Sequence, residues 1–494
     1  MTPELNRRQF IQGLGVTAAT IAVGNSVFTL AGCSPATTTP TTPTTPTKPP
    51  ATTIPTYKNF LIPALAKNTS SDPTKATFEL IAQKGKVEFF SGKQTDTFGY
   101  NGSYLGPTIR VKKGQEVNIK VKNQLDETIT THWHGALLPG EMDGGPHQII
   151  SAGGEWNPHF VIEQPAATLW YHTHTMGQTG QQVYKGLAGL LIIDDEVSAG
   201  LNIPKDYGMN DIPLVIQDRR FAADGSLQYM TKPEDAMGMQ GDTILVNGFV
   251  NSVLEVSTVK MRFRILNASN ARVYNLILSD DSNFTQIASD AGFLQSPVEL
   301  NALKLSPGER AEIIIDFSKH AVGDTITLKS QTNNTINIMD FSVINKANDA
   351  TTIPNTLTTI TKIPESAAVK TRTFTMSGIG PLSHINNLQM NRQTGMDTIH
   401  ESVKLGDTEI WEVISAAAGG MSHPFHVHGM HFQVLDINGN PPPANHQGWK
   451  DTVLVETTNK VRIIAVFKYK GLFMLHCHNL EHEDAGMMLQ YECK

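Results

Sequence analysis

Histidine is concentrated in four short clusters that lie far apart along this 494-residue chain and hold ten of its 17 histidines. The clusters are His132-Trp133-His134, His172-Thr173-His174, His423 through His428, and His476-Cys477-His478 followed by His482. In a β-strand, residues i and i+2 point to the same face, so each His-x-His pair presents two imidazoles side by side. A single pair could be an ordinary surface or core pair. Four clusters in one chain instead predict metal ions that lie close together.

Cys477 indicates which metal these clusters bind. If residues 476–478 are extended, the two histidines point one way and the thiolate points the other, so one segment serves two metal sites. A thiolate, two imidazoles and a weak axial thioether match a blue electron-transfer copper, and Cys477, His423, His482 and Met487 supply such a set. Zinc is the rival metal. It would favour a closed tetrahedral set with several cysteines, or an open site with three ligands, and neither kind of site uses ten histidines in this way.

The rest of the chain favours β structure. Apolar and polar residues alternate over residues 117–122, which is the pattern of a half-buried strand, and residues 112–115 are a plausible turn before it. The same alternation predicts half-buried strands over residues 261–265, where Arg262 and Arg264 are the polar members, and over residues 461–467. No long segment has helical periodicity, and 40 glycines with 27 prolines favour many turns.

A weak internal similarity indicates how many domains there are. Residues 169–174 are followed by an apolar strand at residues 187–193, and residues 473–478 are followed by another at residues 487–489. Two similar β units near the ends of the chain, separated by a third unit without His-x-His, predict three β-sandwiches. The expected domains are residues 57–195, 196–350 and 351–494.

The first 56 residues are predicted to be an export signal and a tether. Arg7-Arg8 before a short apolar segment resembles a twin-arginine signal, and Leu30-Ala31-Gly32-Cys33 resembles a lipobox whose cysteine would be acylated. A transmembrane anchor and an ordinary signal-peptidase site are the competing interpretations. Residues 34–56 are almost wholly Thr, Pro and Ala, which predicts an extended spacer. We therefore expect a signal over residues 1–33 and a periplasmic or cell-surface protein tethered to a membrane through lipid on Cys33.

Charge and cysteine content exclude other classes. The net charge of −7 argues against nucleic acid as a partner, because that partner would require a basic face. The three cysteines, Cys33, Cys477 and Cys493, cannot form a disulfide framework. Cys493 is expected to be a free thiol on a C-terminal strand or tail. From residue 57 onward no apolar run is long enough to span a bilayer.

From about residue 95 to its end, the chain resembles the bacterial three-domain multicopper oxidases, both laccase-like and cuprous-oxidase-like. The most specific likeness is the run from His476 to Met488, and the next is His132 to Gly135 with Glu141 to Pro146. The resemblance implies an all-β fold of three cupredoxin-like Greek-key β-sandwich domains, and a monomer.

The resemblance also implies four copper ions. The type 1 copper would take His423, Cys477, His482 and Met487; the type 2 copper His132 and His426; one type 3 copper His134, His172 and His478; and the other type 3 copper His174, His428 and His476. Every expected ligand position is filled. This argues against relatives that keep the fold, have lost copper and serve as scaffolds.

The implied activity couples four one-electron oxidations of a donor to the reduction of dioxygen to two waters. Electrons would enter near His482 and pass through Cys477, while Asp143 and Glu483 would relay protons. The alternative for Asp143 is a turn residue, and for Glu483 an exposed acid. Met487 as a thioether ligand favours a lower type 1 potential than an enzyme that lacks it.

The electron donor is left open between phenolic compounds and cuprous or other metal ions. Copper-tolerance members of the family carry a methionine-rich insert before the third domain, whereas the methionines here are scattered, as core filler often is. These are Met230, Met237, Met239, Met390, Met396, Met421 and Met430. A copper-binding envelope lipoprotein that sequesters copper without turnover is the alternative function. A copper nitrite reductase has no type 3 pair and would not need the doubled motifs.

Overall fold

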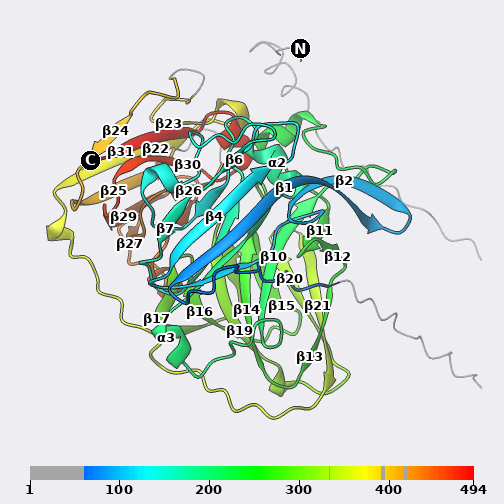
Figure 1. The fold of residues 1–494 in the computed structure, drawn as a ribbon. Coiled ribbons are helices and arrows are strands. Elements are labelled where there is room, and N and C mark those ends of the chain that lie inside the picture. The colour runs from blue at the N-terminus through cyan, green and yellow to red at the C-terminus, as the bar shows by residue number, and fades with distance from the viewer. Residues whose placement is uncertain (1–59, 333, 391–394, 417–420) are drawn as a thin grey trace, which may run out of the picture. The chain divides into compact units, whose positions relative to one another are not determined.

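The structure, a computed structural model, describes residues 60–332, 334–390, 395–416 and 421–494. The predicted signal with Arg7, Arg8 and Cys33, and the predicted spacer, lie outside these residues. Within them the strands form six sheets, which pair around three separate hydrophobic cores. Figure 1 shows the three groups in blue to cyan, in green, and in yellow to red. The prediction of an all-β fold of sandwich domains is confirmed.

The first sandwich joins a sheet of order β2-β1-β4-β6, with β7 also paired to β4, to a sheet of order β3-β9-β8-β5. Its strands are β1 (Lys75–Phe90), β2 (Lys93–Tyr100), β3 (Ile109–Lys112), β4 (Glu116–Asn123), β5 (His132–His134), β6 (Glu155–Trp156), β7 (His159–Val161), β8 (Ala167–His172) and β9 (Ala188–Asp194). Val117, Ile119 and Val121 of β4 are buried and their neighbours are not, as the alternation predicted, except that Asn123 is also buried.

The second sandwich joins a sheet of order β12-β11-β10-β14-β19-β16-β17 to a sheet of order β13-β21-β20-β15-β18. Its strands are β10 (Asp211–Arg219), β11 (Thr243–Val246), β12 (Phe249–Val250), β13 (Val253–Ser257), β14 (Lys260–Asn267), β15 (Tyr274–Leu278), β16 (Phe284–Ser289), β17 (Gly292–Leu300), β18 (Leu303–Leu305), β19 (Arg310–Asp316), β20 (Thr325–Gln331) and β21 (Thr335–Asn345). None of the twelve proposed ligands lies on these strands.

One strand of the second sandwich differs from its prediction. Strand β14 was expected to be half-buried, yet Arg262 and Arg264 are only 3% and 2% exposed. Arg264 donates to Asp211 of β10 at 2.7 Å and to Glu312 of β19 at 3.0 Å. Thr168 of the first sandwich donates to the same Glu312 at 2.7 Å. The prediction was wrong because β14 lies inside a sheet whose outer face packs against the first sandwich, where paired charges tolerate burial.

The third sandwich joins a sheet of order β23-β22-β25-β29-β27 to a sheet of order β24-β31-β30-β26-β28. Its strands are β22 (Lys370–Ser377), β23 (His384–Ile385), β24 (Glu401–Val403), β25 (Thr408–Ser415), β26 (His423–Val427), β27 (Phe432–Ile437), β28 (Thr452–Val455), β29 (Lys460–Val466), β30 (Gly471–Cys477) and β31 (Met488–Cys493). Cys493 is a buried free thiol on β31, as expected of a C-terminal strand.

Helices are few and short in the described part of the chain, in agreement with the sequence. They are α2 (Thr179–Lys185), α3 (Glu196–Gly200) and α4 (Leu480–Asp484), with single 3-10 turns such as η1 (Gly140–Met142), η2 (Pro233–Met237) and η5 (Gly380–Leu382). No helix among these residues has the length and apolar character needed to cross a membrane. The proposed domain limits at residues 195 and 350 stay predictions.

Candidate metal centre

Eight histidines pack into one buried cluster between the first and third sandwiches. Strand pairing explains part of this arrangement, because His132 of β5 lies opposite His172 of β8, and His426 of β26 lies opposite His476 of β30. His174 and His478 lie just beyond the ends of β8 and β30, so the strand argument covers only one member of each of these two pairs. The cluster consists of His132, His134, His172, His174, His426, His428, His476 and His478, each at most 2% exposed.

Imidazoles from the two sandwiches are in direct contact within this cluster. The rings of His134 and His426 stack with centroids 3.7 Å apart, and those of His132 and His428 stack at 3.8 Å. The Nε2 atom of His476 lies 3.1 Å from that of His174 and 3.2 Å from that of His428. His174, His428 and His476 therefore offer three nitrogen atoms within 4.8 Å of one another. This trio is the set that the resemblance assigns to one type 3 copper.

The backbone fixes which nitrogen several of these rings present. The Nδ1–H groups of His132, His172 and His426 donate to the carbonyl oxygens of Asp143, Thr173 and Asp451 at 2.7–2.9 Å. Their Nε2 atoms are buried and have no hydrogen-bond partner among the described residues. Burial also lowers the pKa of His172 and His426 well below its usual value, so these rings are neutral. Neutral imidazoles with free, buried lone pairs are what copper requires of its ligands.

His134 presents its other ring nitrogen, Nδ1, to the cluster. Its Nε2 lies 3.1 Å from Asp451 Oδ1 and 3.2 Å from Thr452 Oγ1, and its Nδ1 is the buried atom without a partner. Asp451 in turn accepts two hydrogen bonds, at 2.7 and 2.5 Å, from Arg310 at the start of β19. The second sandwich thus contributes a buried cation that orients a carboxylate at the cluster. No sequence motif predicts Asp451 and Arg310 as part of the site, because they are 141 residues apart.

A second candidate site lies inside the third sandwich, around Cys477. The sulfur atom of Cys477 lies 3.6 Å from Nδ1 of His423 and 3.7 Å from Nδ1 of His482. These three side chains and Met487 are each at most 1% exposed. Burial raises the pKa of the Cys477 thiol, so a thiolate here needs a cation beside it. Cys477 belongs to the core of the sandwich, whereas the flanking His476 and His478 lie in the eight-histidine cluster.

The two candidate proton carriers, Asp143 and Glu483, contact different histidines of the cluster. His428 Nδ1–H donates to Asp143 Oδ2 at 2.7 Å, and His132 Nδ1 lies 3.4 Å from the same oxygen. Glu483 is 1% exposed, with its two oxygens each 3.3 Å from Nδ1 of His174 or His476. The alternative of an exposed acid is therefore wrong for Glu483. Asp143 does follow the η1 turn, yet its side chain also reaches the cluster.

The two carboxyl groups experience opposite effects on their pKa. Burial raises the pKa of Glu483 well above its usual value, and the neighbouring Asp484 raises it further. Burial alone would raise the pKa of Asp143 as well, but the imidazoles of His428 and His132 outweigh burial and lower it. Glu483 is thus biased toward the protonated form and Asp143 toward the ionised form.

Several methionines that are scattered in the sequence come together in the fold. Met390, Met474 and Met488 are buried against one another, and Met176 and Met396 pack against them. Met430 lies in the core of the third sandwich. Met237 and Met239 instead lie in or next to η2, beside α4. Of the seven methionines singled out in the sequence, the expectation of core filler holds for three and fails for one: Met239, Met390 and Met430 are buried, Met237, Met396 and Met421 are half-buried, and Met230 is 42% exposed.

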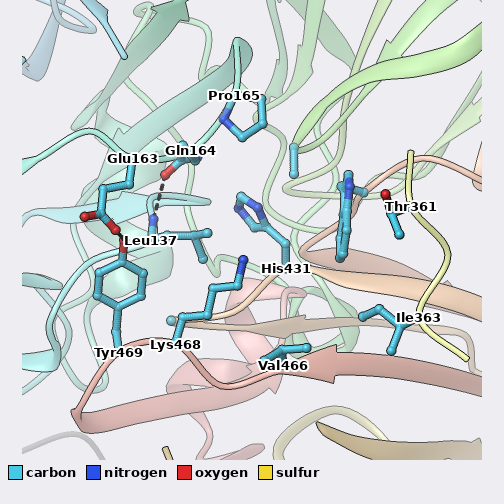
Figure 2. Close-up of a pocket in the computed structure, with 13 residues that line it drawn as sticks. Leu137, Glu163, Gln164, Pro165, Thr361, Ile363, His431, Val466, Lys468 and Tyr469 are labelled. Atoms are coloured by element: carbon cyan, nitrogen blue, oxygen red, sulfur yellow. Dashed lines mark hydrogen bonds between the residues drawn. The ribbon is translucent and has the colours of Figure 1, made fainter. Parts of the chain in front are cut away.

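A cavity of about 460 Å³ opens where the first and third sandwiches meet. Figure 2 shows the His431 side chain among the residues that line it, with Tyr469 donating to Glu163 at one side. His431 Nε2–H donates to the carbonyl oxygen of Gly135 at 2.8 Å. Gly135 follows His134 and Gly429, another lining residue, follows His428, so the cavity reaches residues adjacent to two histidines of the cluster.

Comparison with known proteins agrees with this geometry. Sequence models described as multicopper oxidase match residues 81–198, 222–340 and 354–494. Multicopper oxidase mco of Staphylococcus haemolyticus is 42% identical over 436 residues, which cover 88% of this chain and 92% of that protein. Cell division protein FtsP of Xenorhabdus nematophila is 35% identical, over 83% of this chain and 87% of that protein. The crystal structure of a laccase from Pediococcus acidilactici has a TM-score of 0.83 at 37% identity, covering 88% of this chain and 93% of that one.

Proposed function

This chain belongs to the multicopper oxidase family, and we propose that it couples four one-electron oxidations of a donor to the reduction of dioxygen to two waters. The observation that carries the proposal is the tripeptide 476–478. Its cysteine lies in a site with two imidazoles, and its two histidines belong to the eight-histidine cluster. An electron accepted at the first site therefore has a covalent path of a few bonds to the second.

The proposal assigns four copper ions to these residues. His423, Cys477, His482 and Met487 would hold a type 1 copper, and the eight clustered histidines would hold one type 2 and two type 3 coppers. When bound, the copper ions supply one-electron chemistry and the reaction with dioxygen. The unpaired, buried ring nitrogens of the cluster support this assignment, because leaving them without a partner would cost free energy.

Reduction of dioxygen to water consumes protons, and we assign their delivery to Asp143 and Glu483. Asp143 accepts a hydrogen bond from His428, and Glu483 lies between His174 and His476, so each carboxyl group is beside rings from both sandwiches. A buried carboxyl group close to the reaction can hold a proton and release it there.

The oxygen-consuming reaction is tested with copper-loaded protein in an oxygen electrode. Cuprous, ferrous, manganous and phenolic donors are supplied in turn, and we expect oxygen uptake with at least one of them, at four electrons per dioxygen and without accumulation of hydrogen peroxide. Absence of uptake with every donor, in protein that holds its full copper content, would favour a lipoprotein that sequesters copper or a scaffold. Because a cell division protein is among the similar proteins, the experiment has to distinguish an oxidase from a scaffold.

We also propose that the protein is exported by the twin-arginine route and tethered as a monomer to a membrane through lipid on Cys33. The paired arginines, the lipobox-like segment and the Thr/Pro-rich spacer support this location. Mass spectrometry of the mature N-terminus tests it: an acylated Cys33 as the first residue is expected, and an unmodified mature N-terminus elsewhere would contradict it.

A further inference from the structure

The cavity in Figure 2 has the size and the walls of a small-molecule site. Its volume of about 460 Å³ lies within the range of roughly 300–1,000 Å³ that such sites occupy. All three sandwiches contribute to it, with Leu137 and Pro165 from the first, Ala291 from the second, and Trp449 and Val466 from the third. Of the described residues that line it, none is a proposed copper ligand. The cavity is therefore a different place from both candidate copper sites.

His431 presents a hydrogen-bond acceptor to this cavity. The residue is only 9% exposed, and its Nε2–H donates to the carbonyl oxygen of Gly135 at 2.8 Å. Burial lowers the pKa of His431 below its usual value, so the ring is neutral and its Nδ1 carries a lone pair. This Nδ1 has no hydrogen-bond partner among the described residues. Because buried polar atoms are normally satisfied, the free nitrogen indicates a place for a donor that comes from outside the chain.

Lys468 supplies a positive charge close to this ring. In Figure 2 its amino group points toward the His431 side chain, and the nearby ammonium lowers the pKa of His431 further. The Lys468 side chain forms no ion pair or hydrogen bond with any residue that the structure describes. Glu163, a carboxylate at the edge of the cavity, accepts the hydroxyl of Tyr469 at 2.6 Å instead. The cavity therefore contains a cation that still lacks an anionic partner.

The remaining walls are mostly apolar. Trp449 is half-buried and lines the cavity together with Leu137, Ile363 and Val466. Ile363 is held in place because its backbone N–H donates to the Gln433 side chain at 3.0 Å. An indole ring and aliphatic side chains around a cavity of this size favour a flat apolar molecule.

We propose that this cavity binds a small aromatic carboxylate that also carries a hydroxyl group. The carboxylate pairs with Lys468, the hydroxyl donates to Nδ1 of His431, and the aromatic ring lies against Trp449 and the aliphatic walls. An inorganic anion would satisfy only the lysine, and a plain hydrocarbon would satisfy only the walls. The ligand is bound at this site without being oxidised there, because no proposed copper ligand lines the cavity.

The test is isothermal titration calorimetry of the copper-loaded protein with three matched probes. 4-(Hydroxymethyl)benzoate carries both polar groups, 4-methylbenzoate lacks the hydroxyl group, and methyl 4-(hydroxymethyl)benzoate lacks the charge. We expect 4-(hydroxymethyl)benzoate to bind one site per chain about tenfold more tightly than either of the others, which is the size of one net hydrogen bond. This probe is an alcohol and not a phenol, so that it does not serve as an electron donor during the titration.

Substitutions assign the two polar contacts. Lys468→Met should remove the preference for the acid over its methyl ester, and Lys470→Met, at an exposed lysine outside the cavity, is the control that should retain it. His431→Phe should remove the preference for the hydroxymethyl group. His431→Gln, which keeps a donor for Gly135 and an acceptor for the ligand, should preserve that preference. Because Lys468 is exposed, Lys468→Met decides the matter if His431→Phe fails to fold.

Three results would overturn the proposal. They are the absence of saturable binding at millimolar 4-(hydroxymethyl)benzoate, equal affinity for all three probes, and binding by Lys468→Met with the same preference as in Lys470→Met. The titration is carried out on the oxidised protein without an electron donor. Its outcome is therefore independent of the proposed oxidase function, whose failure would appear only as a lack of oxygen uptake.

Discussion

The two candidate copper sites of this protein are built in different ways. The site around Cys477 is formed within one sandwich, by β26, β30, α4 and the residue before β31. The eight-histidine cluster takes four rings from the first sandwich and four from the third, and His174 and His476, which meet in it, are 302 residues apart in sequence. The first site depends on the register of neighbouring strands, in which Phe425 lies opposite Cys477. The second depends on how two sandwiches dock.

This difference shows why the second sandwich is required although it supplies no ligand. Its Arg310 pairs with Asp451, which orients His134. It also supplies the Met237 carbonyl oxygen that accepts a hydrogen bond from His482. The two sites should therefore respond separately to substitution: a change at Cys477 should affect that site, and a change at Arg310 should affect the cluster.

The largest expected effect separates the sites completely. Cys477→Ser removes the thiolate, so the blue absorption and oxidase activity should both fall to background, while the eight histidines still bind their copper. Copper content per chain and visible absorption measure this. Cys493→Ser, which changes the other described cysteine of the same sandwich, is the control and should retain both colour and activity. Blue absorption in Cys477→Ser would show that the thiolate is not the ligand.

The next effect concerns the cluster alone. Arg310→Met leaves Asp451 as an unpaired buried charge, which should cost about 3–5 kcal/mol of unfolding free energy. Without Arg310, Asp451 should no longer hold its hydrogen bond with His134, and copper binding in the cluster should weaken by about 10–100-fold. The blue absorption should persist. Urea unfolding and copper content are the measurements.

Arg372→Met is the matched control for this prediction, because Arg372 forms a buried pair with Glu409 in the third sandwich and contacts no candidate ligand. It should destabilise the protein to a similar degree and leave copper content unchanged. Equal copper loss in both variants would mean that Arg310 acts only through general stability.

A smaller effect is expected for proton delivery. Asp143→Asn keeps an oxygen that can accept from His428 but cannot ionise, so oxygen reduction should slow by about 10²-fold. Reduction of the type 1 site by a donor should keep its rate, because the Asp143 side chain is bonded to His428 and lies beside His132, both in the cluster. Stopped-flow reduction and reoxidation measure the two steps. Glu141→Gln, at an exposed acid two residues away, is the control; unchanged reoxidation at every pH in Asp143→Asn would remove Asp143 from proton delivery.

Much of this arrangement could be predicted from local sequence patterns. The alternation in residues 117–122 predicted β4, and the His-x-His spacing predicted that pairs of imidazoles would share a strand face. The all-β fold and the family are confirmed. The spacing could not say which histidine meets which across the sandwiches, because ring contacts such as that of His134 with His426 depend on docking.

The parts that sequence could not give are pairings of distant polar residues. The alternating pattern predicted that Arg262 and Arg264 lie on the exposed face of a strand. Their partners, Asp211 and Glu312, lie about 50 residues away on either side, so no local pattern reveals the pairing. Asp451 and Arg310 carry no motif for the same reason. In the sequence Met237 is one of several scattered methionines. Its backbone carbonyl accepts a hydrogen bond from His482, and no pattern of side chains predicts a contact made by the backbone.

The smallest expected effect tests how far the local site tolerates change. Met487→Leu replaces the axial thioether with a hydrocarbon of similar volume, so the fold should lose less than about 1.5 kcal/mol. The type 1 potential should rise, because the thioether no longer stabilises the oxidised ion. Turnover should change by less than roughly tenfold, since the thiolate and both imidazoles remain. Redox titration of the blue absorption measures the potential, and Met488→Leu, in the neighbouring methionine cluster, is the control that should leave it unchanged. An equal shift in both variants would mean that the potential reports packing of β31, and that Met487 is not a ligand.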